Sequence, residues 1–180
     1  MATPTTLPAT FTAGQVLTAA EMNNLRGAFR VLQVVTAAKS DTFTTTSTSM
    51  TDLTDVTVSI TPSATSSLIL INVAINNAVS GDIAAFYQLV RGTTAIAIGD
   101  AAGTRQRTTF AYVPGASGNF NMLSSSMTFV DSPATTSATT YKVQCRVNAG
   151  TLYVNRNSSD SDATTTPRAI STITVMEISA

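Results

Sequence analysis

The chain has 180 residues, with ten Lys plus Arg against ten Asp plus Glu. This length fits one domain with a short appendage. A balanced charge provides no long-range field to attract nucleic acid or an anionic membrane, so we expect neither as a partner. Charged residues make up only 11% of the chain, whereas threonine and serine exceed a quarter of it. Solvent-facing positions are therefore largely hydroxylic, which favours strands over helices.

The first 13 residues carry Pro4 and Pro8 among threonines and alanines. This composition predicts an extended arm with no core of its own. The start lacks the basic and apolar regions of a signal peptide, and no apolar stretch approaches the length of a bilayer. We therefore expect a soluble chain that is not exported.

A short helix is predicted from about residue 19 to residue 28, because Thr18 and Glu21 are spaced as a capping box. Its apolar side chains fall at three- and four-residue spacing, which places them on one stripe. Isolated helices this short are unstable, so the stripe must dock on its own domain, on sister copies or on another protein. The sequence leaves these three open and predicts the following partner-binding residues: Leu17, Met22, Leu25 and Phe29.

From Val31 onward the apolar period changes to two, with turn residues about every ten positions. This spacing is typical of an antiparallel β-sandwich. We therefore divide the chain into an attachment segment, residues 1–30, and a sandwich domain, residues 31–180. Strands are expected near 30–36, 42–48, 53–60, 68–76, 84–91, 94–98, 104–112, 121–130, 139–147, 151–155 and 169–178.

The strand patterns differ in how many faces they bury. Val56, Val58 and Ile60 alternate with polar residues, which predicts one core face and one wet face. Residues 68–75 are apolar on both faces for much of their length, as expected of a central strand covered on each side. The second cover could be a neighbouring subunit.

The composition argues against an enzyme. Without histidine, neither a Ser-His-Asp nor a Cys-His arrangement can form. The single cysteine, Cys145, lies on an alternating strand and is expected to point inward as a small hydrophobe. Most acidic residues are aspartates scattered among turns, so a glycosidase pair is weakly supported. We expect no catalytic residue, no cofactor and no metal.

Three other segments have competing interpretations. Asp160 and Asp162, with Asn157, could offer oxygens to calcium, but Asx turns explain them at least as well. Arg105 and Arg107 are expected on one strand face, as a solvated surface or a salt bridge between subunits. Residues 99–103 fit a hairpin end better than a phosphate loop. A glycan site on tyrosine rings has four candidates, Tyr87, Tyr112, Tyr141 and Tyr153.

Several segments resemble small virion structural proteins of tailed phages, described as tail-fibre-like or head decoration proteins. These are residues 11–23 (FTAGQVLTAAEMN), 61–67 (TPSATSS), 129–133 (FVDSP), 140–144 (TYKVQ), 153–156 (YVNR) and 171–178 (STITVMEI). The resemblance implies a jelly roll of the tumour-necrosis-factor and C1q type, assembled as a homotrimer. It also implies that the N-terminal segment joins the domain to capsid or tail proteins of the particle.

Three functions follow in order of support. The first is a non-enzymatic structural virion protein, assembled in the host cytoplasm, that serves as a capsid decoration, head fibre or short tail fibre. The second is a receptor-binding module whose loops, such as residues 99–105 and 114–121, contact a host glycan or protein. The weakest is a depolymerase using scattered aspartates. Head or tail location stays open.

Overall fold

The computed structural model describes residues 14, 16, 18, 19, 30–114 and 122–179. Among these residues only Ala19 is helical. No helix in the described part is long and apolar enough to cross a bilayer. The strands are β1 (Val31–Lys39), β2 (Phe43–Thr45), β3 (Thr51–Ile60), β4 (Leu68–Val79), β5 (Ala85–Arg91), β6 (Thr94–Ile96), β7 (Phe110–Tyr112), β8 (Leu123–Asp131), β9 (Thr139–Val147), β10 (Leu152–Val154) and β11 (Ser171–Ile178).

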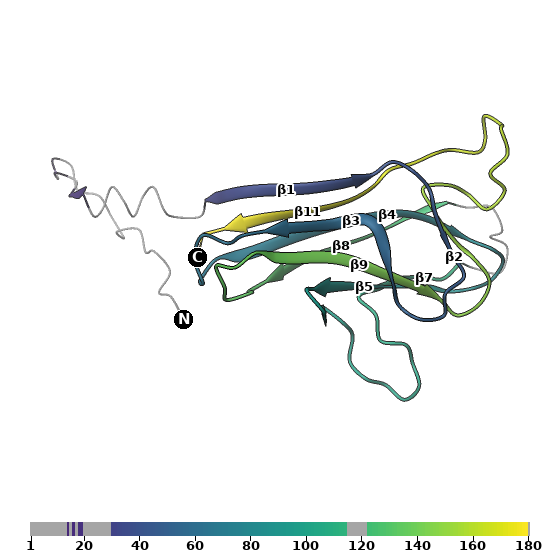
Figure 1. Ribbon diagram of the computed structural model, residues 1–180, viewed down its shortest axis with the longest axis horizontal. Helices are drawn as coiled ribbons and strands as arrows, with labels where there is room; N and C mark the ends of the chain where they lie inside the picture. The colour runs from purple at the N-terminus through teal and green to yellow at the C-terminus, as the bar shows by residue number, and fades with distance from the viewer. Residues whose placement is uncertain (1–13, 15, 17, 20–29, 115–121, 180) are drawn as a thin grey trace.

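Two antiparallel sheets pack face to face, as Figure 1 shows. Sheet A has the order β1-β11-β4-β8. On the side of β4 where β11 pairs with residues 68–74, the short β10 pairs with residues 77–79, and β2 pairs with β10. Sheet B has the order β3-β9-β5, with β6 and β7 both paired to β5. Apart from the hairpin of β5 and β6, paired strands are not consecutive in the chain. The expected all-β, jelly-roll-like sandwich is confirmed.

The core lies between the sheets and is built from the inward side chains of alternating strands. Ile69, Ile71 and Val73 of β4 face sheet B and are buried. Tyr141, Val143 and Cys145 of β9 face sheet A and are also buried. The expected inward position of Cys145 is therefore confirmed, and the period-two pattern predicts which side of each strand is dry.

Most expected strands are present, with ends shifted by a few residues, but the one expected at 104–112 is largely wrong. Only Phe110–Tyr112 pairs with β5, and Arg105 and Arg107 lie in a loop. The Thr108 and Thr109 hydroxyls accept hydrogen bonds from the backbone amides of Tyr87 and Leu89, at 3.1 and 2.9 Å. The threonine hydroxyls thus take the place of backbone carbonyls that a longer β7 would have offered to these amides of β5.

The N-terminal predictions fall mostly outside the described residues. The extended arm, most of the expected helix and the partner-binding residues Leu17, Met22, Leu25 and Phe29 all lie there. The described chain enters the sandwich at Arg30, whose carbonyl accepts from the Ser179 amide at 2.9 Å. The Arg30 amide donates to Ser179 Oγ at 3.0 Å. The N-terminal segment and the C-terminus therefore meet the domain at the same end (Figure 1).

Buried polar groups bind sheet A to the loop between β3 and β4 and to sheet B. Glu177 of β11 is fully buried and accepts from the Ser63 amide and from the Ser63 and Ser67 hydroxyls, all at 2.6 Å. Its other oxygen accepts from Gln33 Nε2 at 2.6 Å. Burial by itself would raise the pKa of Glu177, but these hydrogen bonds lower it to about 2. The carboxylate is thus held ionised without a cation.

Glu177→Gln is expected to lower the free energy of unfolding at neutral pH by about 1–3 kcal/mol, because an amide cannot accept all four hydrogen bonds. Because the pKa of Glu177 is lower in the folded protein than the roughly 4.3 of an unfolded chain, its ionised form stabilises the fold at pH values above roughly 4.3. This contribution is lost as the pH falls towards 2. The difference between wild type and variant should therefore shrink in acid. Urea unfolding at about pH 7 and pH 3 measures it. Asp82→Asn, at an exposed carboxylate, is the control.

A second cluster lies on the other side of β4 in the same rung of sheet A, because Glu177 and Asp131 both pair with Ile69. Asp131, at the end of β8, accepts from Arg91 Nη1 through both oxygens, at 2.9 and 3.0 Å. The hydroxyl of Tyr141 donates to Asp131 Oδ2 at 2.6 Å. Asp131 and Tyr141 are buried, whereas Arg91 is half-buried. The Asp131 carboxylate of sheet A thus binds both β5 and β9 of sheet B.

Lys39 forms a third connection. Its side chain is 1% exposed, and Nζ lies 2.7 Å from Asp41 Oδ1 and 3.4 Å from Asp55 Oδ2. Asp55 has a φ of 64° where the pairing of β3 with β9 is irregular. The buried ammonium of β1 therefore binds the irregular part of β3 across the sandwich.

Candidate assembly surface

The outer face of sheet A carries the side chains of β1, β11, β4 and β8 that point away from the core. The pairing registers place these residues in rungs across the sheet. One rung is wholly apolar and consists of Val34, Met176, Leu70 and Val130. Val34 and Val130 are 55% and 48% exposed. Monomeric domains seldom leave such a row uncovered, and larger contiguous patches mark interaction sites.

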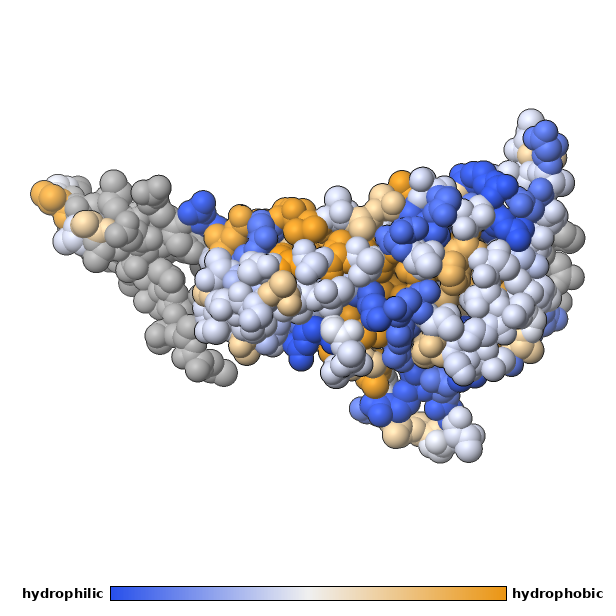
Figure 2. Space-filling model, viewed as in Figure 1, coloured by the Kyte–Doolittle hydropathy of each residue, from blue (hydrophilic) through white to orange (hydrophobic). Residues whose placement is uncertain are grey.

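The next rung towards the chain termini is apolar as well. It contains Val31, Ile178 and Leu68, and Leu32 stands beside it at an irregularity in the pairing of β1. Val31 and Leu32 are both exposed. Figure 2 shows hydrophobic side chains gathered over this end of β1. The apolar surface therefore extends to the point where the N-terminal segment leaves the domain.

The two rungs on the other side of the apolar rung are small and hydroxylic. Thr36 and Thr174 lie with their hydroxyl oxygens 2.9 Å apart, and Thr128 donates to Asn72 Oδ1 at 2.7 Å. Because these groups hydrogen-bond within the sheet, covering them with another surface costs little desolvation energy. The following rung continues the pattern with Ala38, Thr172, Ala74 and Ser126.

No charged side chain projects from this face along β1, β11, β4 or β8. The charged residues of these strands are Lys39, Glu177 and Asp131, which are at most 7% exposed and hydrogen-bonded inside the sandwich. Interface cores are depleted in charge relative to the remaining protein surface. An uncharged face of four strands therefore has the composition of a contact surface.

The outer face of sheet B is different. Lys142 Nζ pairs with Asp52 Oδ2 at 2.8 Å, and Gln144 Nε2 donates to Asp52 Oδ1 at 2.8 Å. Gln88 donates to Gln144 at 3.2 Å. These partly exposed side chains form a chain of polar contacts suited to water. The two faces of one sandwich thus have opposite character, and the outer face of sheet A is the candidate surface for assembly.

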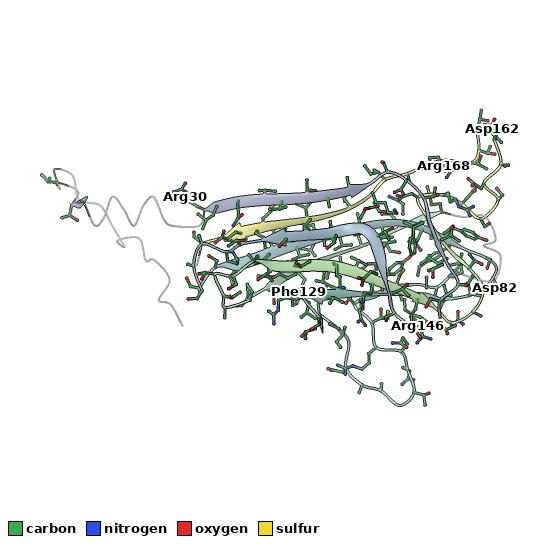
Figure 3. The ribbon with its side chains drawn as sticks, in the orientation of Figure 1. Arg30, Asp82, Phe129, Arg146, Asp162 and Arg168 are labelled. Carbon is green, nitrogen blue, oxygen red and sulfur yellow. The ribbon has the colours of Figure 1, made fainter. Side chains whose placement is uncertain are left out.

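Strand β8 forms an open edge of sheet A. It pairs with β4 on one side, and no described strand pairs with its other side. Residues 123–130 contain no charge and no proline, which are the usual protections of an edge strand. Its inward Met127 and Phe129 are only half-buried against the core (Figure 3). The edge is therefore a second uncharged surface.

The structure gives the candidate chemical groups ordinary structural roles. Cys145 is fully buried, and burial raises the pKa of its thiol to about 12, which makes it a poor nucleophile. Asp160 pairs with Arg168 at 2.6 Å and with Arg156 at 3.6 Å. Asn157 Oδ1 accepts from the Asp160 amide, as in an Asx turn. No cluster that could hold a metal ion occurs among the described residues.

The tyrosines offer little ring surface for stacking a sugar. Tyr87, Tyr112 and Tyr141 are buried, and the Tyr87 ring stacks on Phe110 at 4.8 Å between centroids. The guanidinium of Arg156 lies 4.2 Å above the ring of half-buried Tyr153. None of the four therefore presents a bare aromatic face.

Sequence reasoning did not predict the outer face of sheet A as a site, although one signal was present. The two-sided apolar pattern of residues 68–75 indicated that β4 needs a cover on each face, and within the described part of the chain only sheet B covers it. The partners of Leu70 in the apolar rung lie on distant strands, so only the registers bring them together. A scan against protein-family models found no match, and a search of the curated proteins found none either.

Proposed function

We propose that this chain is a non-enzymatic structural protein of a tailed-phage particle. In this proposal it forms a homotrimeric jelly-roll appendage, as a capsid decoration, head fibre or short tail fibre, and is attached through its N-terminal segment. The observation that carries the assembly role is the uncharged outer face of sheet A, opposite a polar sheet B. The phage setting and the number three rest on the resemblance of the sequence segments described above.

The surface is suited to contact between copies. A stable interface buries on the order of 1,200–2,000 Å² in total. Four strands of eight to twelve residues offer a broad face. Four polar side chains on it hydrogen-bond in two pairs, Thr36 with Thr174 and Thr128 with Asn72, so they lose little on desolvation. The hydrophobic contribution then comes from the two apolar rungs.

A ring fits the arrangement better than a two-fold dimer. The outer face of sheet A and the open edge of β8 are different surfaces of one copy. If the edge of one copy packs on the face of the next, the contact is head-to-tail, and such contacts form a ring when the rotation between copies closes. A ring covers every face and every edge, and it removes the exposed strand edge that threatens aggregation.

Attachment is assigned to residues 1–30, including Leu17, Met22, Leu25 and Phe29. This segment joins the domain at the end that carries the C-terminus, away from the loop containing Asp162 and Arg168 (Figure 3). An anchor at one end leaves the opposite loops directed outward. The particle proteins that receive it would be capsid or tail components.

Deletion of residues 1–29 is expected to leave a folded, soluble domain that no longer enters particles, because Arg30 and its hydrogen bonds to Ser179 are kept. Circular dichroism and immunoblotting of purified particles measure the two properties. The apolar stripe alone is tested by a full-length variant that carries Leu17→Ser, Met22→Ser, Leu25→Ser and Phe29→Ser. Normal incorporation of both variants would contradict attachment through this segment.

The alternative function is a receptor-binding module. The loop between β10 and β11 extends from the end opposite the attachment segment, and the loop between β6 and β7 extends from the side of the sandwich (Figure 1). Loops on a rigid β-scaffold commonly carry recognition. Adsorption of particles lacking the protein separates this function from a purely structural one, since only a receptor-binding module is needed for attachment to the host.

A further inference from the structure

Three described arginines of the β-domain, Arg105, Arg107 and Arg146, form no ion pair, unlike most of its other cations. Among the described residues, the ion-paired cations are Lys39, Arg91, Lys142, Arg156 and Arg168. Apart from Arg30, beside the N-terminal segment, the cations outside these pairs are Arg105, Arg107 and Arg146. In a chain with so few charges, these three share one location.

They form a corner between sheet B and the loop that joins β6 to β7. Arg146 of β9 donates from Nη1 to Gln106 Oε1 at 2.8 Å, and Gln106 stands between the other two arginines in the loop. Arg107 Nε donates to the Gly99 carbonyl at 2.7 Å, which closes the base of the loop. We call Arg105, Arg107 and Arg146 the arginine corner; Figure 3 labels Arg146.

The corner is ordered and partly open to solvent. The guanidinium of Arg146 lies 5.7 Å from the centroid of the Phe86 ring, which fixes its plane. Arg105 and Arg107 are exposed. Asp100 is the only carboxylate of the loop, and no ion pair links it to the corner. Positive charge is thus concentrated here although the chain is neutral overall.

We propose that the arginine corner binds the anionic groups of an acidic cell-surface polysaccharide. Guanidinium groups pair with carboxylates and phosphates through two parallel hydrogen bonds. A single exposed ion pair contributes little, so a ligand with one anion would bind weakly. A polysaccharide repeats its anions, and a trimer presents three corners to it, so avidity supplies the affinity. The avidity step rests on the homotrimer proposed above.

Nucleic acid is also a repeating polyanion, but the corner fits it poorly. Single-strand binding relies on aromatic faces for base stacking, and the ring that the structure describes beside Arg146, Phe86, lies under its guanidinium. Three arginines are also few for a groove that displaces counterions along a backbone. DNA therefore serves as a competing ligand in the test.

The experiment measures retention of the full-length protein on immobilised polygalacturonate, with neutral dextran as reference, at about 50 mM and about 500 mM salt. The corner variant is Arg105→Gln, Arg107→Gln and Arg146→Gln. The matched control, Lys142→Gln, Arg156→Gln and Arg168→Gln, removes the same charge from ion-paired positions. A fourth variant, Arg105→Gln with Arg107→Gln, changes only exposed loop residues and guards against misfolding.

Wild type is expected to bind polygalacturonate and not dextran, and to lose binding at the higher salt. The corner variant should bind roughly tenfold more weakly or worse, and the loop variant should fall between it and wild type. The control should bind like wild type. Absence of binding by wild type, equal loss in the control, or equally tight binding of random DNA overturns the proposal. Native mass of the corner variant is read alongside, because an intact trimer shows that the assembly proposal stands.

Discussion

Replacement of Leu70 by glutamate is expected to convert the assembled protein into monomers. Leu70 lies between Met176 and Val130 in the apolar rung of sheet A. Its side chain points away from the core, which Ile69 and Ile71 enter. An unpaired carboxylate buried in a subunit contact costs several kcal/mol, and a symmetric ring meets that cost once for each copy. Native mass spectrometry and light scattering measure the change in mass directly.

The matched control is Ser59→Glu, which adds the same charge to an exposed position on the polar face of sheet B. This variant should keep the mass of the wild type. Circular dichroism and urea unfolding should show that both variants are folded. A Leu70→Glu protein with unchanged mass, or a wild type that is monomeric at micromolar concentration, would remove sheet A as the assembly surface.

Replacement of Asp131 by alanine should strongly destabilise the domain. The change leaves the buried Tyr141 hydroxyl without its acceptor and Arg91 without its ion pair. Removal of one partner from a buried charge pair costs about 3–5 kcal/mol. Urea unfolding at neutral pH measures this as a lower midpoint with a similar slope.

A double variant tests whether the cluster acts as a unit. In the double variant Asp131→Ala with Tyr141→Phe, the unsatisfied hydroxyl is absent. The stability loss of the double variant should therefore be smaller than the sum of the losses of the two single variants. Asp52→Ala provides the comparison, because its pairs with Lys142 and Gln144 are exposed and should contribute about 0–1 kcal/mol. An Asp131→Ala loss no larger than that of Asp52→Ala would show that the cluster does not stabilise the sandwich.

The buried polar clusters explain how the outer face of sheet A remains free of charge. Lys39, Glu177 and Asp131 all belong to strands of sheet A, yet none of them projects from its outer face. Lys39 and Asp131 bind residues of sheet B, whereas Glu177 binds Gln33 and the serines of the loop between β3 and β4. The residues that carry charge on these strands therefore stabilise the domain internally and leave the outer face of sheet A uncharged.

Solvent-facing charge, in contrast, is concentrated on sheet B and the loops. Arg105 and Arg107 stand in the loop between β6 and β7, and Arg146 lies beneath it on β9. Figure 2 shows hydrophilic side chains on this loop and on the loops at the end opposite the chain termini. If sheet A faces sister copies, as proposed, these regions remain exposed to solvent.

The sequence by itself determined the fold class and most strand positions, because side chains alternate with a period of two and turn residues separate the runs. It determined that Cys145 faces inward and that no histidine-based catalysis is available. It also indicated that residues 68–75 need a cover on both faces. These are local properties, and they can be read from neighbouring residues along the chain.

Only the tertiary structure decided which side chains share a surface. Val34, Leu70, Val130 and Met176 are up to about 140 positions apart, and their rung exists because three strand pairings have one particular register. The short β7, which leaves Arg105 and Arg107 in a loop, likewise depends on threonine hydroxyls that reach the backbone of β5. A register shifted by one residue would turn every side chain to the other face, and no local pattern along the chain specifies that choice between distant strands.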